Sequence, residues 1–71
     1  MKLTQLIEKL ESNNIKVIRE EISKVSKYYR VYFIIGDSTP IQFGDRFYAN
    51  QDPEIQERYI KFIEEQTGLK F

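Results

Sequence analysis

The sequence contains no cysteine and no histidine. Without cysteine there is no disulfide and no thiolate nucleophile, and without histidine the commonest general base and most transition-metal ligands are missing. Glycine is also scarce, and the three glycines stand alone at expected turns, so no glycine-rich phosphate-binding loop is present. These absences argue against an enzyme, and we expect no cofactor and no metal.

Carboxylates are the remaining groups that could carry acid–base chemistry or bind a cation. Glu20 and Glu21 are neighbours on an expected strand, so their side chains should point to opposite faces. Asp37 and Asp45 could flank one end of a sheet and hold a hard cation, although turn residues are the simpler interpretation. We therefore expect no catalytic residue and no metal ligand.

Long apolar runs are also missing. No stretch approaches the ~20 apolar residues of a membrane span, and no basic region followed by an apolar run opens the chain. A chain of 71 residues has room for one domain, covering residues 1–71. We expect a soluble, cytoplasmic protein with no membrane partner.

Charge is balanced overall but unevenly distributed. The formal net charge is zero, whereas residues 16–30 are basic. Non-specific nucleic-acid binders usually have a net basic domain, because phosphate neutralisation supplies much of their affinity. The neutral total argues against nucleic acid as a partner, and the basic segment keeps it as an alternative. Its cations are Lys16, Arg19, Lys24, Lys27 and Arg30.

Apolar periodicity predicts a helix at each end of the chain. In residues 2–12 the apolar positions recur at helical spacing and form a single stripe, made of Leu3, Leu6, Ile7 and Leu10. The second helix should begin with Asp52 as N-cap and Pro53 at the first helical position. It should end at Gly68 in a left-handed C-cap.

Three segments between the helices have the pattern of strands. Residues 15–22 carry apolar side chains on both faces, or form an edge strand with protective charges. Residues 27–35 are rich in aromatic and β-branched side chains and should be the central strand. Residues 41–43 have the pattern of a short third strand. Residues 44–51 show no clear periodicity, and we expect a loop there whose aromatic side chains, Phe47 and Tyr48, pack against the domain.

The central strand should present two different faces, because successive side chains alternate. Tyr29, Val31, Phe33 and Ile35 form the row expected in the core. With both helices on that side, the chain is an α+β protein: a two-layer αβββα domain with a three-stranded antiparallel meander. The opposite side of the sheet then has no second layer from this chain.

That open face is the predicted partner-binding surface. Aromatic rings interleaved with a guanidinium are typical of protein–protein hot spots, and a second copy of the chain would suit them as well as another protein. The same residues could stack bases, so an RNA- or DNA-binding domain is the alternative. A structural role, with the face covered by the 44–51 loop, is the third interpretation. The candidate residues are Tyr28, Arg30, Tyr32, Ile34, Ile18 and Lys27.

The first helix and strand resemble those of the HicA-type toxins. The similar segments are residues 3–10, Leu-Thr-Gln-Leu-Ile-Glu-Lys-Leu, and residues 12–19, Ser-Asn-Asn-Ile-Lys-Val-Ile-Arg. This resemblance implies an αβββα fold related in shape to double-stranded RNA-binding domains. Those toxins share a Gly-Ser-His after the first strand, whereas this chain has Glu20 to Ser23 there and no histidine. The resemblance therefore implies no nuclease activity.

The order of elements also looks like that of small phage-encoded anti-CRISPR inhibitors, which act by occupying a partner's nucleic-acid site. An isoleucine- and lysine-rich composition with a single alanine is typical of AT-rich bacterial or phage genomes. From these likenesses we expect a small inhibitor or regulator of phage or mobile-element origin.

Overall fold

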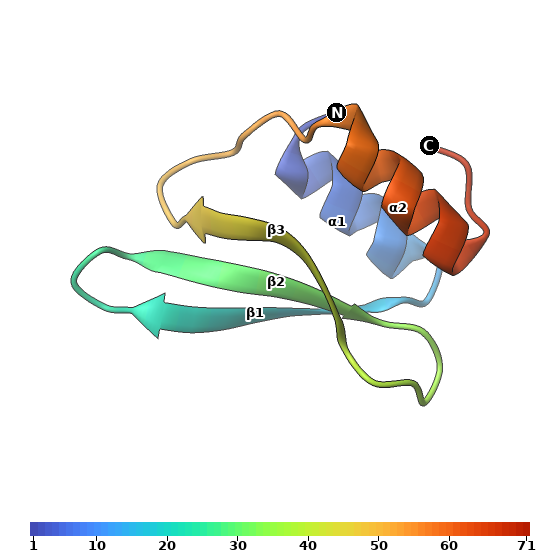
Figure 1. Cartoon of the computed structure of the whole chain (residues 1–71), viewed down its shortest axis with the longest axis horizontal. Helices are drawn as coiled ribbons and strands as arrows, with labels where there is room; N and C mark the ends of the chain where they lie inside the picture. The colour runs from blue at the N-terminus through green and yellow to red at the C-terminus, as the bar shows by residue number, and fades with distance from the viewer.

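The computed structural model describes residues 1–71, apart from the side chain of Asp45, and has two layers (Figure 1). The strands form one antiparallel sheet in the order β1-β2-β3, so β2 is central and β1 is an edge strand. Both helices lie on the same side of this sheet. The predicted αβββα meander is confirmed. In chain order the elements are α1 (Leu3–Ser12), β1 (Lys16–Ser23), β2 (Tyr28–Ile34), β3 (Ile41–Tyr48) and α2 (Glu57–Thr67).

The apolar stripe of α1 packs onto the sheet as its spacing predicts. Its four apolar residues, Leu3, Leu6, Ile7 and Leu10, are all buried. Asn14 follows the helix with a φ of 63°, and the Ile15 N–H donates to the Leu10 carbonyl at 3.0 Å. Asparagine tolerates this left-handed conformation, which turns the chain directly into β1.

The helix-facing row of β2 forms the centre of the core. Val31 and Phe33 have no exposed surface, and Tyr29 and Ile35 are half-buried at the two ends of the row. Phe33 lies between Val17 of β1 and Ile41 of β3 in the strand register. The predicted core face of the central strand is therefore confirmed.

The third strand is longer than its sequence pattern indicates. Residues 44–48 are strand rather than loop, and Phe43 and Phe47 are both buried. The register between β2 and β3 shifts at this point, with Gly44 at a φ of 73°. Extra residues on one strand interrupt the two-residue alternation that identifies a strand in a sequence, so the continuation of β3 was hidden.

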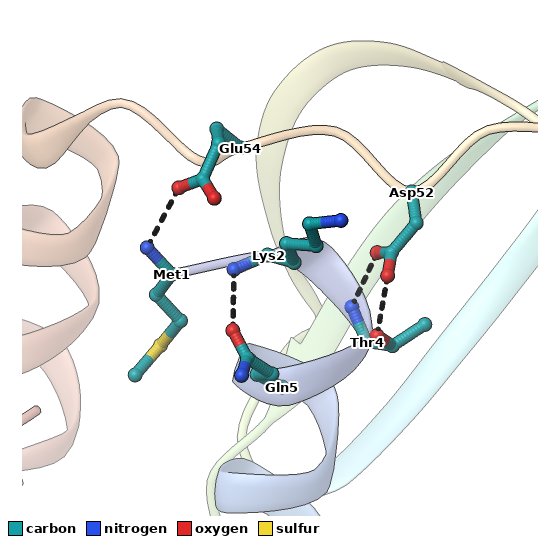
Figure 2. A network of polar contacts seen from close by, with 6 residues as sticks. All are labelled: Met1, Lys2, Thr4, Gln5, Asp52 and Glu54. Atoms are coloured by element: carbon teal, nitrogen blue, oxygen red, sulfur yellow. Dashed lines mark hydrogen bonds and ion pairs between the residues drawn. The ribbon is translucent and has the colours of Figure 1, made fainter.

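The predicted start of the second helix is wrong. The helix α2 begins at Glu57, and Asp52 instead binds the start of α1 (Figure 2). The Asp52 carboxylate accepts the Thr4 backbone N–H at 2.9 Å and the Thr4 hydroxyl at 2.7 Å. The Leu3 N–H donates to the Pro53 carbonyl. Asp52 does act as a helix cap, but it accepts a free N–H group of α1, 48 residues away in the sequence, instead of capping the helix that follows it.

The Asp52–Thr4 contact also perturbs the carboxyl group. The Thr4 backbone N–H, followed by the Thr4 hydroxyl, holds the pKa of Asp52 below its ordinary value, because both donors favour the ionised form. Next to it, the terminal amine of Met1 donates to Glu54 at 2.8 Å. Residues 1–4 and 52–55 are thereby joined, which ties the start of α1 to the segment before α2.

The C-terminal end of α2 is as predicted. Gly68 has a φ of 76°, and its N–H donates to the Glu64 carbonyl at 2.8 Å. Leu69 packs against the core after this left-handed residue. Among the described residues, no helix combines the length and the apolar character needed to cross a bilayer.

Candidate interaction face

The side of the sheet opposite the helices carries the predicted partner-binding residues of β2. Val31 and Phe33 point into the core, so Arg30, Tyr32 and Ile34 point the other way. Tyr32 and Ile34 are half-buried and Arg30 is exposed. We call this surface, together with the flanking side chains of β1 and β3 described below, the open face.

β1 contributes an apolar side chain and a carboxylate to the open face. Ile18 lies opposite Tyr32 in the register and Glu20 lies opposite Arg30. The Tyr32 hydroxyl donates to the Glu20 carboxylate at 3.2 Å, which holds the ring in place. The adjacent Glu21 is paired with Tyr29 and points to the helix side. The two carboxylates therefore point apart, as strand alternation predicts, and cannot form a catalytic pair.

β3 adds two residues to the open face that the sequence interpretation did not include. Tyr48 packs edge-on against Tyr28 with ring centroids 6.1 Å apart, and the Arg46 guanidinium lies 4.9 Å from the centroid of Tyr28. Tyr28 is thus held between an aromatic ring and a cation. Cross-strand pairing with Tyr28 is the signal that would have identified Tyr48, but it needs a strand where a loop was predicted.

The segment after Gly44 continues the sheet and places Phe47 and Tyr48 on opposite faces. Phe47 turns to the helix side, where its ring packs against Tyr29 with centroids 6.2 Å apart. Tyr48 turns to the other side and is 38% exposed. The loop predicted over residues 44–51 is wrong for residues 44–48, which extend the sheet. Arg46 and Tyr48 nevertheless contact Tyr28 on the open face.

Lys27, the remaining predicted partner-binding residue, is separate from the others. It lies at the end of the β1–β2 hairpin with a φ of 55° and lines a concavity on the helix side of the sheet. Arg19 and Lys24 line the same concavity, whereas Lys16 and Arg30 belong to the open face. The basic segment of the sequence is therefore divided between the two faces of the sheet.

The described residues include no cluster of three His, Cys, Asp or Glu side chains that could hold a metal ion. The side chain of Asp45 lies outside the described residues, so the Asp37–Asp45 cation site is not among the arrangements that the structure describes.

No protein-family model matches the chain, and neither the curated proteins nor the solved structures include a match. The resemblance to the HicA-type toxins and to anti-CRISPR inhibitors stays a prediction. The function has to be argued from the geometry of the molecule.

Proposed function

We propose that the chain is a non-enzymatic interaction module whose open face binds another protein, with a second copy of the chain among the possible partners. The observation that carries this proposal is the uncovered second side of the sheet. Both helices lie on the other side, and on this side Tyr28, Tyr32 and Ile34 are each only half-buried. Soluble monomers seldom leave contiguous apolar surface without a partner.

The open face has the chemistry of a protein-binding hot spot. Tyrosine and arginine are the residue types most enriched at such sites. Tyr32 is held by Glu20, and Tyr28 is held between Tyr48 and Arg46. Side chains that are already ordered lose little conformational entropy on binding, which favours association.

The charges of the open face indicate what the partner should offer. Lys16, Arg30 and Arg46 contribute three cations, and Glu20 contributes one carboxylate. A partner surface with acidic groups around an apolar centre would complement this arrangement. By occupying such a surface, the chain would act as an inhibitor or regulator, the role expected of a small phage or mobile-element protein.

The proposal is tested by variants that change the open face and leave the fold intact. Tyr32→Ala and Arg30→Glu should abolish self-association in sedimentation equilibrium, or abolish enrichment of a specific protein in affinity capture. Lys61→Glu on the exposed side of α2 makes the same charge change as Arg30→Glu and should retain binding. Equal behaviour of all three variants and the parent chain would overturn the proposal.

A nucleic-acid partner is the second candidate, and the observation that favours it is the Arg46–Tyr28 pair beside Arg30. Stacked aromatic and guanidinium groups on an open sheet are how many RNA-binding sheets hold bases. Salt separates the two functions, because phosphate contacts make affinity fall steeply as salt rises. Affinity for single-stranded RNA that falls more than about tenfold between 50 and 200 mM salt would favour nucleic acid.

A further inference from the structure

The β1–β2 hairpin extends past the ends of the two helices (Figure 1). A concavity of about 710 Å³ lies beside it. The volume is within the usual range for small-molecule sites. Tyr28 of the open face also borders this concavity, whereas Arg19, Glu21 and Tyr29 line it from the helix side of the sheet. The lining residues used below are Arg19, Glu21, Lys24, Lys27, Tyr29 and Gln51.

Two charged residues occupy core-side positions of β1. Arg19 is paired with the fully buried Val31, and Glu21 is paired with Tyr29. Both are nevertheless exposed, and they line the concavity together with Thr4 at the start of α1. A helix packed here would leave these charges desolvated, so this end of the sheet is suited to a polar ligand rather than to a second layer.

The concavity has an excess of positive charge. Arg19, Lys24 and Lys27 face one carboxylate, Glu21. In the part of the chain that the structure describes, none of these three cations forms an ion pair. Three cations on one small surface attract a multiply charged anion such as a phosphate group, and an arginine can bind it through two parallel hydrogen bonds.

The backbone around Lys27 gives the concavity a defined shape. The Lys27 N–H donates to the Ser23 carbonyl at 2.9 Å, and the Lys27 carbonyl accepts the Ala49 N–H at 2.9 Å. The Gln51 N–H in turn donates to the Tyr48 carbonyl. These bonds fix the end of the hairpin against residues 49–51, so opposite walls of the concavity are joined in the free protein.

Tyr29 supplies a flat, partly apolar surface beside the cations. Its ring is half-buried and packs against Phe47 on one side. Its hydroxyl makes no hydrogen bond to any described residue. A ring that lines the concavity and is held by a neighbouring ring is suited to stacking an aromatic base, and its hydroxyl can donate to a polar ligand atom.

We propose that this concavity binds a nucleoside phosphate. The phosphate contacts Arg19, Lys24 and Lys27, and the base stacks on Tyr29. Glu21 accepts a hydrogen bond from a ribose hydroxyl. This role explains why one carboxylate lies among the three cations that line the concavity. The same chemistry is offered by a free mononucleotide and by the terminal nucleotide of a single strand.

Amide chemical-shift titrations of the whole chain with adenosine 5′-monophosphate test this proposal. We expect saturable shifts in residues 19–29 and 49–51, with affinity about tenfold above that for inorganic phosphate, as one stacked base predicts. Adenosine without a phosphate should bind more weakly than the nucleotide. Absence of saturable shifts, or equal affinity for inorganic phosphate and the nucleotide, would overturn the proposal.

Substitutions locate the binding to this concavity. Arg19→Ala and Lys27→Ala should each weaken nucleotide binding several-fold, as expected for loss of one charge-assisted contact. Arg30→Ala also removes one exposed cation, but from the opposite face, and should leave nucleotide affinity unchanged. An affinity unaffected by Arg19→Ala, in a variant whose melting temperature is unchanged, would contradict the proposal.

A 5′-phosphorylated tetranucleotide distinguishes the two sources of the ligand. Equal affinity for the tetranucleotide and the monophosphate assigns the concavity to free nucleotides, and tighter binding of the tetranucleotide assigns it to a strand end. In both cases the affinity must fall with Arg19→Ala. Tetranucleotide binding that depends on Arg30 and not on Arg19 would place nucleic acid on the open face and overturn the inference.

Discussion

The two faces of β2 consist of similar residue types and differ in what covers them. On the helix side, Val31 and Phe33 have no exposed surface, whereas on the open face Tyr32 is half-buried and Arg30 is exposed. The difference arises because both helices pack on one side. Apolar area on the covered side contributes to folding, while much of the area on the open side is still available for association.

Phe33→Ala should have the largest effect on stability, because it removes a fully buried ring from the centre of the covered face. We expect a loss of about 3–5 kcal/mol in the free energy of unfolding, which includes the cavity that remains. Urea denaturation followed by circular dichroism measures this loss. A tolerated Phe33→Ala would mean that the two faces of β2 are exchanged.

Gly44→Ala should be next in size, because it disturbs the covered face through Phe47. A Cβ at this position would lie 2.5 Å from the Phe47 ring, and the backbone has a φ of 73°. Overpacking and the left-handed conformation together should cost about 3 kcal/mol. A nearly neutral result in thermal denaturation would show that β3 can change its register at the bulge.

Asp52→Asn tests the contact that joins the start of α1 to the segment before α2. We expect a fall in melting temperature smaller than that of Gly44→Ala, because the carboxylate loses charge while its Thr4 donors remain. Asp37→Asn makes the same change in a turn, where no described residue donates a hydrogen bond to the carboxylate. It should leave the melting temperature nearly unchanged.

The same contact predicts a pH dependence. The pKa of Asp52 is lower in the folded chain than in the unfolded chain, so the unfolded chain takes up the proton first as the pH falls. The stabilisation is complete at neutral pH and is lost as the pH falls through the lowered pKa. Asp52→Asn should flatten this part of the acid-denaturation profile, and an unchanged profile would contradict the assignment.

Gly68→Ala should have a smaller effect, at the end of the helix layer. A Cβ at Gly68 meets no atom within 4 Å, so only the strain of a φ of 76° remains. We expect a loss of about 1 kcal/mol. Comparison with Gly44→Ala separates backbone strain from steric overlap, because both glycines have positive φ. Equal losses of unfolding free energy for the two variants would show that overlap with the Phe47 ring adds nothing to the cost at Gly44.

Tyr32→Ala should have the smallest effect on folding and the largest effect on association. It removes cross-strand contacts and an exposed hydrogen bond to Glu20, which should cost about 0.5 kcal/mol. The same urea titration used for Phe33→Ala measures it. A loss as large as that of Phe33→Ala would show that the open face stabilises the fold, and the comparison between the two faces would fail.

Local signals predicted the parts of this protein that depend on neighbours in the sequence. The stripe of α1, the alternation of β2 and the left-handed Gly68 are all visible in the sequence and all present in the structure. From the open face, Tyr28, Arg30, Tyr32, Ile34 and Ile18 were identified correctly as one surface by strand parity and register. Whether they bind a partner stays a prediction.

Long-range contacts decided the rest, because they bring together residues whose sequence separation carries no signal. Asp52 has the pattern of an N-cap for the helix that follows it, yet it binds Thr4. Tyr48 joins the open face only because the bulge at Gly44 carries β3 on beside Tyr28. Lys27 and Arg30 are only three residues apart, yet Lys27 ends the β1–β2 turn and lines the concavity on the helix side, whereas Arg30 lies within β2 and points to the open face. Periodicity defines which side chains share a face, and only packing between distant segments decides which part of that face is left for a ligand.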